Sequence, residues 1–229
     1  MAKIIGHRGA AGIALENSAE SIKAALHLPV EAIEIDARLT KDGHLVTIHD
    51  KDTGRVADKS LWVASSTLAE LKALRLKNGE RLLTIDEAVA LIGKKKRIVL
   101  DLKSGAICTE LIPLLRKYPK ANIMLTSRNY RQLAKIRKAI PGIPFTARSY
   151  IYSTEIVHIA HTLGAAGIAV NKWVLNPLTY YLAKRAGLQI HTYTVNNPLL
   201  VALFSALYPD LHIITNHPER FADDKAPGR

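Results

Sequence analysis

Cysteine and long apolar runs are both scarce in this sequence of 229 residues. There is one cysteine, Cys108, so the chain cannot build a disulfide framework or a cysteine-based zinc cluster of its own. The longest apolar run, Pro198 to Tyr208, has about half the length that a membrane span requires. The sequence starts without a charged-then-apolar leader, and we therefore expect a cytoplasmic protein.

Linkers, low-complexity tracts and internal repeats are also missing. Apolar residues make up 48% and charged residues 23% of the chain, which excludes disorder for most of its length. A chain of this size buries roughly 70–75% of its unfolded surface, enough for one large core. We expect a single domain over residues 1–221, followed by a flexible tail at residues 222–229.

Positive charge is concentrated in one quarter of the chain. The 32 basic and 20 acidic residues give a net charge of +12. Residues 94–148 hold 14 of the basic residues and two of the acidic ones, so their net charge equals that of the whole chain. This segment would suit an anionic substrate or an anionic surface, or it could consist of solvated helices. A nucleic-acid partner is suggested by charge alone, and we do not expect one.

Short, continuously apolar runs alternate with helical patterns along the chain, as in parallel strands covered by helices. An Asp42-Gly43 turn joins the second and third runs into a hairpin. The remaining eight units predict an α/β fold, a single-domain TIM (β/α)8 barrel with a small hairpin extension after the second strand. A doubly wound open sheet is the alternative. The expected strands are 3–7, 32–39, 44–49, 97–103, 122–127, 143–147, 167–170, 189–195 and 212–216. The expected helices lie near 18–27, 68–75, 85–93, 107–117, 129–139, 153–163, 176–186 and 197–206.

Carboxylates lie on the strand ends that a barrel would bring to one rim. Glu34 and Asp36 are two residues apart on one strand, so both point to the same face. Two buried carboxylates repel each other, and a divalent metal with Asp101 as third ligand would resolve the conflict. Oxygen ligands favour Mg²⁺ or Ca²⁺ over zinc. Alternatively, the cation of Arg8, Arg38 or Lys103 neutralises the pair.

Two histidines, His7 and His49, each end a strand at the same rim. Histidines beside a carboxylate cluster are well suited to act as an acid/base pair. Arg8 and Lys103 add fixed positive charge that suits phosphate oxygens. Together these groups predict metal-assisted cleavage of a phosphate ester.

Short motifs follow one another in a fixed order over nearly the whole chain. The opening one is His7-Arg8-Gly9 followed by Leu15-Glu16-Asn17-Ser18. The others are Glu34-Ile35-Asp36, Asp42-Gly43 with Val46-Thr47-Ile48-His49-Asp50, Leu83-Thr84-Ile85-Asp86-Glu87-Ala88, Asp101-Leu102-Lys103, Tyr193-Thr194-Val195-Asn196 and Ile214-Thr215-Asn216-His217-Pro218. The ordered series resembles the glycerophosphodiester phosphodiesterase family, which usually has His-Arg-Gly, Pro-Glu-Asn-Thr and Glu-x-Asp at its start.

The resemblance implies a TIM barrel that hydrolyses glycerophosphodiesters to sn-glycerol 3-phosphate and an alcohol. It implies His7 and His49 as general acid and base, and a divalent cofactor, Mg²⁺ or Ca²⁺. The metal ligands would be Glu34, Asp36 and Asp101, and the substrate-binding residues would be Arg8, Lys103, Glu16, Tyr193 and Arg128. The expected partner is a small glycerophosphodiester, with weak contact to an anionic membrane surface through residues 94–148.

Four departures from the family pattern bear on activity. Asp101 is one methylene shorter than the usual glutamate, and Asn216 replaces an aspartate. Arg128 adds charge near the rim, and Tyr193 replaces a tryptophan. The changes at Asp101, Asn216 and Arg128 keep open a non-catalytic barrel that binds phosphate or an anionic surface. Lysophospholipase D-type hydrolysis of a lipidated glycerophosphodiester is a further alternative, which an apolar funnel beside the rim would favour. Trp173, after the sixth barrel strand, either lines the mouth of the site or packs in the core.

Overall fold

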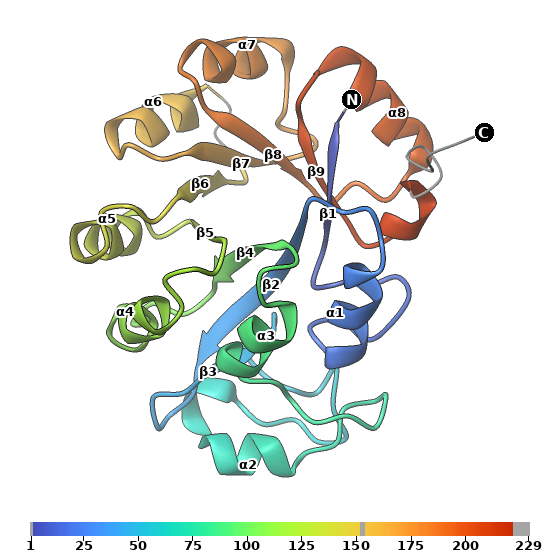
Figure 1. The fold of residues 1–229 in the computed structure, drawn as a ribbon, viewed down its shortest axis with the longest axis vertical. Helices are drawn as coiled ribbons and strands as arrows, with labels where there is room; N and C mark the ends of the chain where they lie inside the picture. The colour runs from blue at the N-terminus through green and yellow to red at the C-terminus, as the bar shows by residue number, and fades with distance from the viewer. Residues whose placement is uncertain (1, 152–153, 222–229) are drawn as a thin grey trace.

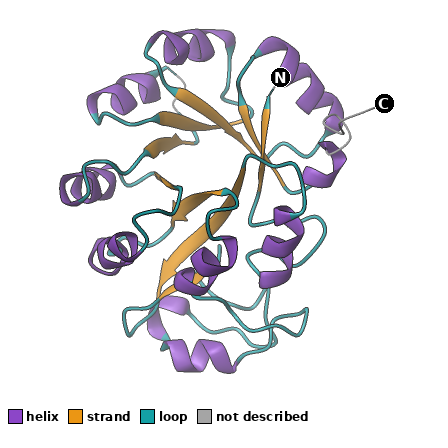
Figure 2. Ribbon diagram, viewed as in Figure 1, coloured by secondary structure: helices purple, strands orange, loops and turns teal. Residues whose placement is uncertain are grey.

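A computed structural model describes residues 2–151 and 154–221, so the tail expected at residues 222–229 lies outside the described residues. Strands form the centre of the molecule and helices surround them (Figures 1 and 2). The strands are β1 (Lys3–Gly6), β2 (Ala32–Leu39), β3 (Leu45–Thr47), β4 (Arg97–Leu102), β5 (Ile123–Ser127), β6 (Phe145–Ser149), β7 (Gly167–Asn171), β8 (Gln189–Tyr193) and β9 (His212–Thr215). The α-helices are α1 (Ala19–Leu26), α2 (Leu68–Ala73), α3 (Ile85–Ile92), α4 (Cys108–Lys117), α5 (Tyr130–Ala139), α6 (Glu155–Thr162), α7 (Pro177–Arg185) and α8 (Pro198–Leu207).

Eight parallel strands close into a barrel, because β1 pairs with β9 on one side and with β2 on the other. The ninth strand, β3, pairs antiparallel with β2 outside the barrel. The turn between them contains Gly43, whose φ of +83° favours glycine. The predicted TIM barrel with a hairpin extension is therefore confirmed, and the open sheet is excluded.

Side-chain caps begin several of the helices. Ser18, Thr67 and Thr84 each accept a hydrogen bond from the backbone N–H three residues later, within capping boxes that start α1, α2 and α3. Asn176 and Asn197 cap α7 and α8, and each is followed by a proline at the first helical position. These local signals fix where each helix starts on the barrel.

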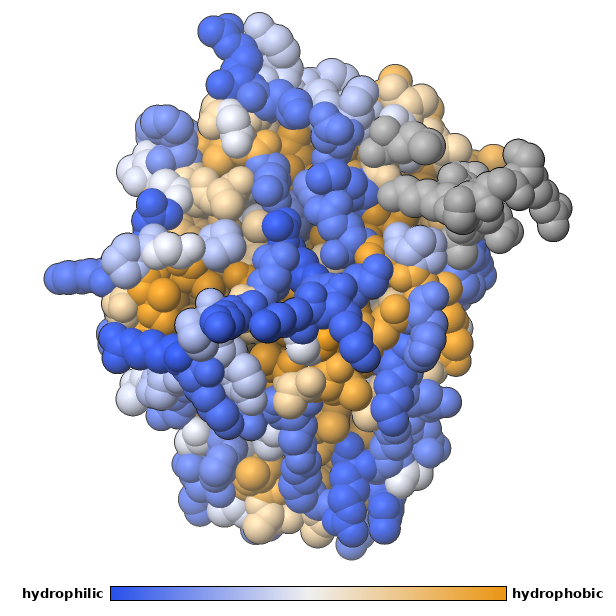
Figure 3. Space-filling model, viewed as in Figure 1, coloured by the Kyte–Doolittle hydropathy of each residue, from blue (hydrophilic) through white to orange (hydrophobic). Residues whose placement is uncertain are grey.

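The main core lies between the outer face of the barrel and its helices. Ile33, Ile98 and Leu125 are fully buried there, as the continuously apolar strand pattern requires. A smaller apolar cluster around Val46 and Leu71 holds the hairpin extension and α2 together. Figure 3 shows that apolar patches on one face of the molecule lie between hydrophilic residues. Among the described residues, no helix is both long enough and apolar enough to cross a membrane.

One strand boundary differs from the prediction in a way that matters for the site. The fifth barrel strand was expected at residues 143–147, but β6 covers Phe145–Ser149. Pro144 directly precedes β6 and has no N–H to donate to a strand ladder, which accounts for the later start. Arg148 therefore lies within the strand, where its side chain reaches Asp101 of β4.

Candidate active site

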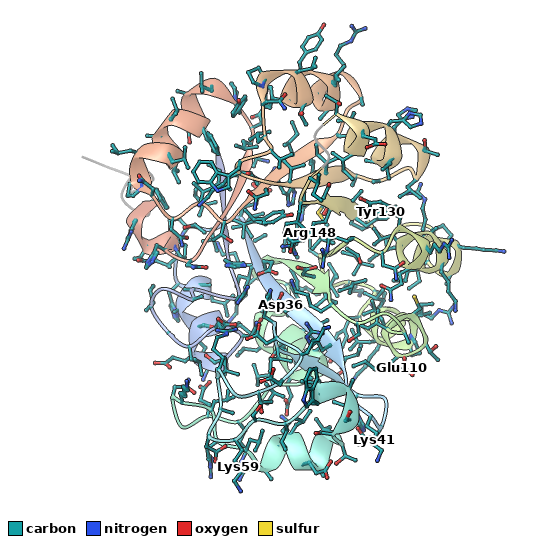
Figure 4. The ribbon with its side chains drawn as sticks, turned by 180° about the vertical axis from the view of Figure 1, so that it is seen from behind. Asp36, Lys41, Lys59, Glu110, Tyr130 and Arg148 are labelled. Carbon is teal, nitrogen blue, oxygen red and sulfur yellow. The ribbon has the colours of Figure 1, made fainter. Side chains whose placement is uncertain are left out.

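Three carboxylates meet inside the barrel near the carboxyl ends of its strands. Glu34 and Asp36 come from β2 and Asp101 from β4, and the register of the two strands places Asp36 directly beside Asp101. One carboxylate oxygen of each residue lies within 4.8 Å of the others. All three side chains are buried, so the predicted cluster forms, and Figure 4 shows Asp36 and Arg148 near the middle of the barrel.

Cations surround this cluster. Lys103 Nζ lies 2.6 Å from Asp101 Oδ2 and 3.1 Å from Asp36 Oδ1. Arg8 Nε lies 3.3 Å from Asp36 Oδ2, and Arg148 donates a hydrogen bond to Asp101. Arg8 and Lys103 thus pair with the carboxylates, as the alternative to a metal predicted. Arg38, the third cation considered, instead donates its Nε–H to the backbone oxygen of His49 at 2.8 Å.

The two carboxylates of β2 have opposite tendencies to ionise. Burial, together with the charge of Asp36, raises the pKa of Glu34 to about 7. Burial would raise the pKa of Asp36 as well, but the charges of Lys103 and Arg8 outweigh it and hold that pKa below its ordinary value. Asp36 therefore stays negatively charged, and a cation added to the cluster would help Glu34 to ionise.

The donor atoms fit a hard divalent cation. Three carboxylate oxygens converge, which is the ligand chemistry that Mg²⁺ and Ca²⁺ prefer. Asp36 Oδ1 is buried, and its contact with Lys103 Nζ at 3.1 Å does not have the geometry of a hydrogen bond, so this oxygen has a lone pair available to a ligand. A bound cation would compete with Lys103 for Asp36 and Asp101.

His7 is held at the edge of the carboxylate cluster. Its Nδ1 lies 2.5 Å from Asn216 Oδ1, and its Nε2 lies 3.9 Å from Glu34 Oε2. Because an amide oxygen only accepts hydrogen bonds, Nδ1 carries the proton, and Nε2 of the neutral ring is left with its lone pair toward the cluster. Burial and the charge of Arg8 lower the pKa of His7 to about 4.

His49 is more open and has a different partner. Its Nδ1 lies 2.7 Å from Asp50 Oδ1, and burial lowers its pKa despite the nearby carboxylates. Asp50 Oδ2 in turn accepts a hydrogen bond from Arg55 Nε at 2.5 Å. Asp50 thereby orients the ring of His49, and Arg55 holds Asp50 in place.

Glu16 lies between two arginines. Arg55 donates two hydrogen bonds of 2.7 Å to its carboxylate, and Arg8 donates one of 2.8 Å. These cations outweigh the effect of burial and lower the pKa of Glu16. The expected substrate-binding role of Glu16 is thus accompanied by a second one, which is to fix the Arg8 side chain beside Asp36.

The loop after β1 holds the site together through its backbone. Arg8 and Gly9 have φ values of +52° and +86°, and a Cβ on Gly9 would lie 2.5 Å from Ser21 Oγ. This conformation lets the Arg8 N–H donate to Glu34 Oε2 at 2.9 Å. Further along, Asn17 donates to Asp36 Oδ2 at 2.8 Å and accepts from the Asp36 N–H at 3.1 Å. Asn17 therefore orients the carboxylate of Asp36.

Arg128 and Tyr193 occupy different parts of the site. The exposed Arg128 stacks over the Tyr150 ring, 4.5 Å from its centroid, and lines an open pocket of about 630 Å³ at the mouth of the barrel. Tyr193 is buried, donates its hydroxyl to Ser149 O at 2.8 Å and packs its ring 4.1 Å from the Arg148 guanidinium. Tyr193 is placed to position Arg148, while Arg128 is free to meet a ligand.

The structure brings all ten predicted site residues to this end of the barrel and adds five whose role the sequence did not define. These are Asn17, Asp50, Arg55, Arg148 and Asn216. Three of them, Asn17, Asp50 and Asn216, lie within the motifs already noted, so their position in the chain was a usable signal. Arg148 lies outside the motifs, directly after the end of an expected strand. Arg55 stands outside every motif, and only the fold shows that it joins Asp50 to Glu16.

Comparison with known sequences points to one family. The profile of the Glycerophosphoryl diester phosphodiesterase family matches residues 7–104. A glycerophosphodiester phosphodiesterase of Caldanaerobacter subterraneus is 29% identical over 207 residues, covering 84% of this chain and 85% of the relative. A glycerophosphodiester phosphodiesterase of Bacillus subtilis is 24% identical, covering 95% of this chain and 84% of the relative.

Solved structures share the fold. A phosphodiesterase of Oleispira antarctica, determined in complex with the product sn-glycerol-3-phosphate, superposes with a TM-score of 0.90 at 22% identity and covers 97% of both chains. A glycerophosphodiester phosphodiesterase of Parabacteroides distasonis gives a TM-score of 0.86 at 25% identity, covering 97% of this chain and 96% of that one.

The fold is a TIM barrel, and the relatives that this chain matches are named glycerophosphodiester phosphodiesterases, which are phosphoric diester hydrolases. The buried carboxylates and cations at the strand ends of this chain are consistent with the chemistry of those relatives. The chain thus resembles the glycerophosphoryl diester phosphodiesterase family, whose profile matches residues 7–104, as its motifs suggested.

Proposed function

We propose that this protein hydrolyses glycerophosphodiesters to sn-glycerol 3-phosphate and an alcohol, with a divalent cation bound by Glu34, Asp36 and Asp101. The observation that carries the proposal is the convergence of these three buried carboxylates within 4.8 Å, beside Arg8 and Lys103. The Oleispira relative of the same fold was determined with this glycerol phosphate as its product. The proposal is thus supported by the site chemistry and by the fold of that relative.

Substrate phosphate would be held by fixed charge. A cation in the carboxylate cluster would polarise a phosphate oxygen and offset the negative charge on the phosphoryl oxygens in the transition state. Arg8 is kept in place by Glu16, and Lys103 by Asp101, so both cations are already oriented for a phosphodiester. Pre-oriented charges stabilise the transition state without having to reorganise during the reaction.

The two histidines would divide the proton transfers. His7 lies deep in the site with Nε2 toward Glu34, and it would accept a proton from the attacking glycerol hydroxyl or water. His49 lines the open pocket through which an alcohol would leave, and it would protonate the departing alkoxide. Asn216 and Asp50 fix the orientation of the two rings, since each contacts the Nδ1 atom.

A lipidated glycerophosphodiester is the second candidate substrate, hydrolysed in the manner of a lysophospholipase D. The favouring observation is that Trp62, Ile151 and Trp173 are all exposed around the mouth of the barrel. An acyl chain could lie against such side chains while the phosphodiester enters the site. The chemistry at phosphorus would be the same for both substrates.

A coupled assay for glycerol 3-phosphate tests the function directly. Glycerophosphocholine and glycerophosphoethanolamine are offered with and without EDTA, and we expect turnover that EDTA abolishes and added Mg²⁺ or Ca²⁺ restores. His7→Ala and His49→Ala should each lower kcat by about 10²- to 10⁴-fold, the usual contribution of general acid–base catalysis. His158→Ala, on the exposed face of α6, is the matched control and should leave kcat unchanged.

Three results would contradict the proposal. Full activity in either histidine variant would exclude that residue as acid or base. Turnover that is indifferent to EDTA would exclude the metal. No turnover of any diester, soluble or lipidated, by metal-loaded protein would favour a barrel that only binds phosphate.

A further inference from the structure

Large apolar side chains are exposed around the mouth of the barrel. Trp173 is 79% exposed, Ile151 is 77% exposed and Trp62 is 60% exposed. Core packing of Trp173, one of the two expectations from the sequence, is therefore wrong. Exposed side chains of this size gathered on one face are a sign of an interaction surface.

These residues stand on opposite sides of the active-site pocket. Ile151 and Trp173 follow the carboxyl ends of β6 and β7, which are neighbours in the barrel. Trp62 comes from the long connection after β3 and lines a depression of about 470 Å³. That depression shares Arg38 and Lys103 with the site pocket, so Trp62 borders the mouth from the other side.

The space between these apolar residues is strongly basic. Six of the 16 residues lining the site pocket are Lys or Arg, and one, Asp101, is acidic. Lys172 Nζ lies 5.2 Å from the ring centroid of Trp173, and Arg128 stacks over Tyr150. Aromatic rings and cations are thus combined in one surface, as at the interface between a membrane and water.

Two barrel helices extend this surface. The helices of a (β/α)8 barrel run antiparallel to its strands, so the first turns of α7 and α8 lie at the mouth end. Leu178 and Leu199, both exposed, occupy those turns, and α7 and α8 lie side by side in the outer ring (Figure 1). Neither helix contains an acidic residue.

We propose that the mouth of the barrel docks on an anionic lipid surface, with Trp62, Ile151 and Trp173 entering the headgroup region. The surrounding Lys and Arg side chains would contact lipid phosphates, and the active-site pocket would open toward the membrane. Of the basic segment 94–148, Lys103, Arg128, Arg131 and Arg148 line the mouth pocket. Lys103 and Arg148 are paired with carboxylates inside the site, so the exposed Arg128 and Arg131 are the part of the segment that takes part in docking.

Charge favours a lipid surface over a second copy of the chain. The protein carries a net charge of +12, and a face-to-face dimer would bring two basic mouths together. An anionic bilayer is complementary to the same face, since it supplies phosphates to the cations and an apolar layer to the indoles. The inference concerns binding, and its test does not depend on turnover or on the metal.

The tryptophans provide a direct readout. Trp62 and Trp173 are the only tryptophans of the chain, so its indole fluorescence reports on the mouth alone. Vesicles of phosphatidylglycerol and phosphatidylcholine in equal parts should shift the emission to shorter wavelength and sediment the protein. Pure phosphatidylcholine should do so much less. Raising the salt from about 0.1 to about 1 M, which shortens the Debye length from about 10 to about 3 Å, should release the protein.

Substitutions locate the surface. The Trp62→Ala/Trp173→Ala double variant should raise the lipid concentration for half-maximal sedimentation at least tenfold and leave hydrolysis of soluble glycerophosphocholine unchanged. Leu207→Ala is the control, because Leu207 is also apolar and, at 56% exposure, nearly as exposed as Trp62, but it ends α8 at the far end of the barrel. It should bind vesicles like the unaltered protein.

Four outcomes would overturn the inference. The first is sedimentation without an emission shift, which would place the contact on another face. The second is equal binding to both vesicle types, and the third is equal binding by the double variant. The fourth is a dimer in solution that the double variant abolishes, with no vesicle binding. If the unaltered protein binds vesicles as expected but hydrolyses no glycerophosphodiester, only the proposed function is contradicted.

Discussion

Nδ1 of His7 and Oδ1 of Asn216 are 2.5 Å apart, although 209 positions separate them in the chain. Asn216 directly follows β9, the strand that pairs with β1 and closes the barrel. Closure of the barrel thus places the Asn216 amide oxygen beside His7, where it fixes the tautomer of the imidazole ring. The Asn216 amide does the orienting without adding the charge that an aspartate would add.

Asn216→Leu should lower kcat by about 10- to 100-fold, because the ring of His7 would lose the acceptor that orients it and general acid–base catalysis depends on that orientation. KM should change little, since Asn216 does not touch the phosphate-binding cations. Asn216→Asp keeps an acceptor at the same place and should retain most of kcat. An effect on thermal unfolding without an effect on kcat would make Asn216 merely structural.

Much of this fold could be predicted because the periodicity of the sequence and the fold agree. Buried parallel strands such as Ala32–Leu39 require continuous apolar runs, and the Asp42-Gly43 turn requires a glycine at positive φ. The alternation of predicted strands and helices along the chain then leaves few possible topologies for the fold. The start of β6 was predicted two residues too early, at residue 143 in place of Phe145, because the apolar pattern does not show that Pro144 has no N–H to donate to the strand ladder.

The site could be predicted as a set of residues but not as a network. Strand periodicity places Glu34 and Asp36 on one face, and this needs no tertiary information. The links of Arg55 to Asp50 and Glu16 depend on how the connection after β3 folds back over the loop after β1. No periodic pattern encodes such a contact, since it joins two irregular segments.

Glu34→Gln should weaken the binding of Mg²⁺ or Ca²⁺ by at least about tenfold in a calorimetric titration, since altering even an outer-shell partner of a metal ligand typically costs 10- to 100-fold. The amide keeps the size of the side chain but removes its charge. Glu155→Gln, on the exposed first turn of α6, is the control and should titrate like the unaltered protein. Equal affinities for the two variants would exclude Glu34 as a ligand.

Arg55→Ala should reduce kcat/KM by about 3- to 10-fold, with most of the effect in kcat, because loss of a hydrogen bond to a charged group typically costs about 1.5–3 kcal/mol and part of this would be recovered by water. Asp50 would lose the donor that holds it against His49, and Glu16 would lose two donors. Arg55→Lys should restore part of the loss. Steady-state kinetics of Arg75→Ala, an exposed arginine away from the site, provide the baseline.

Stability should fall in acid because of two histidines at the other end of the barrel. His191 and His212 stack with ring centroids 4.6 Å apart, and both are buried. Burial lowers the pKa of His191 well below 6.5, with the neighbouring His212 adding to the effect, and burial also lowers the pKa of His212. Neither ring nitrogen of His191 has a hydrogen-bond partner among residues 2–151 and 154–221.

The sign of the pH effect follows from which state binds protons. Above pH 6.5 the histidines are neutral in both the folded and the unfolded chain, so the full stability is present. Below pH 6.5 the unfolded chain takes up protons that the buried histidines of the folded barrel do not, so the free energy of unfolding falls by up to about 1.4 kcal/mol per pH unit for each such group.

Urea unfolding between pH 7 and pH 5 measures how steeply the free energy of unfolding changes with pH. His191→Phe should make this dependence shallower, because the apolar ring removes a buried titratable group without breaking a hydrogen bond. An unchanged slope in His191→Phe, with His158→Phe as the exposed control, would show that His191 does not contribute to the acid sensitivity.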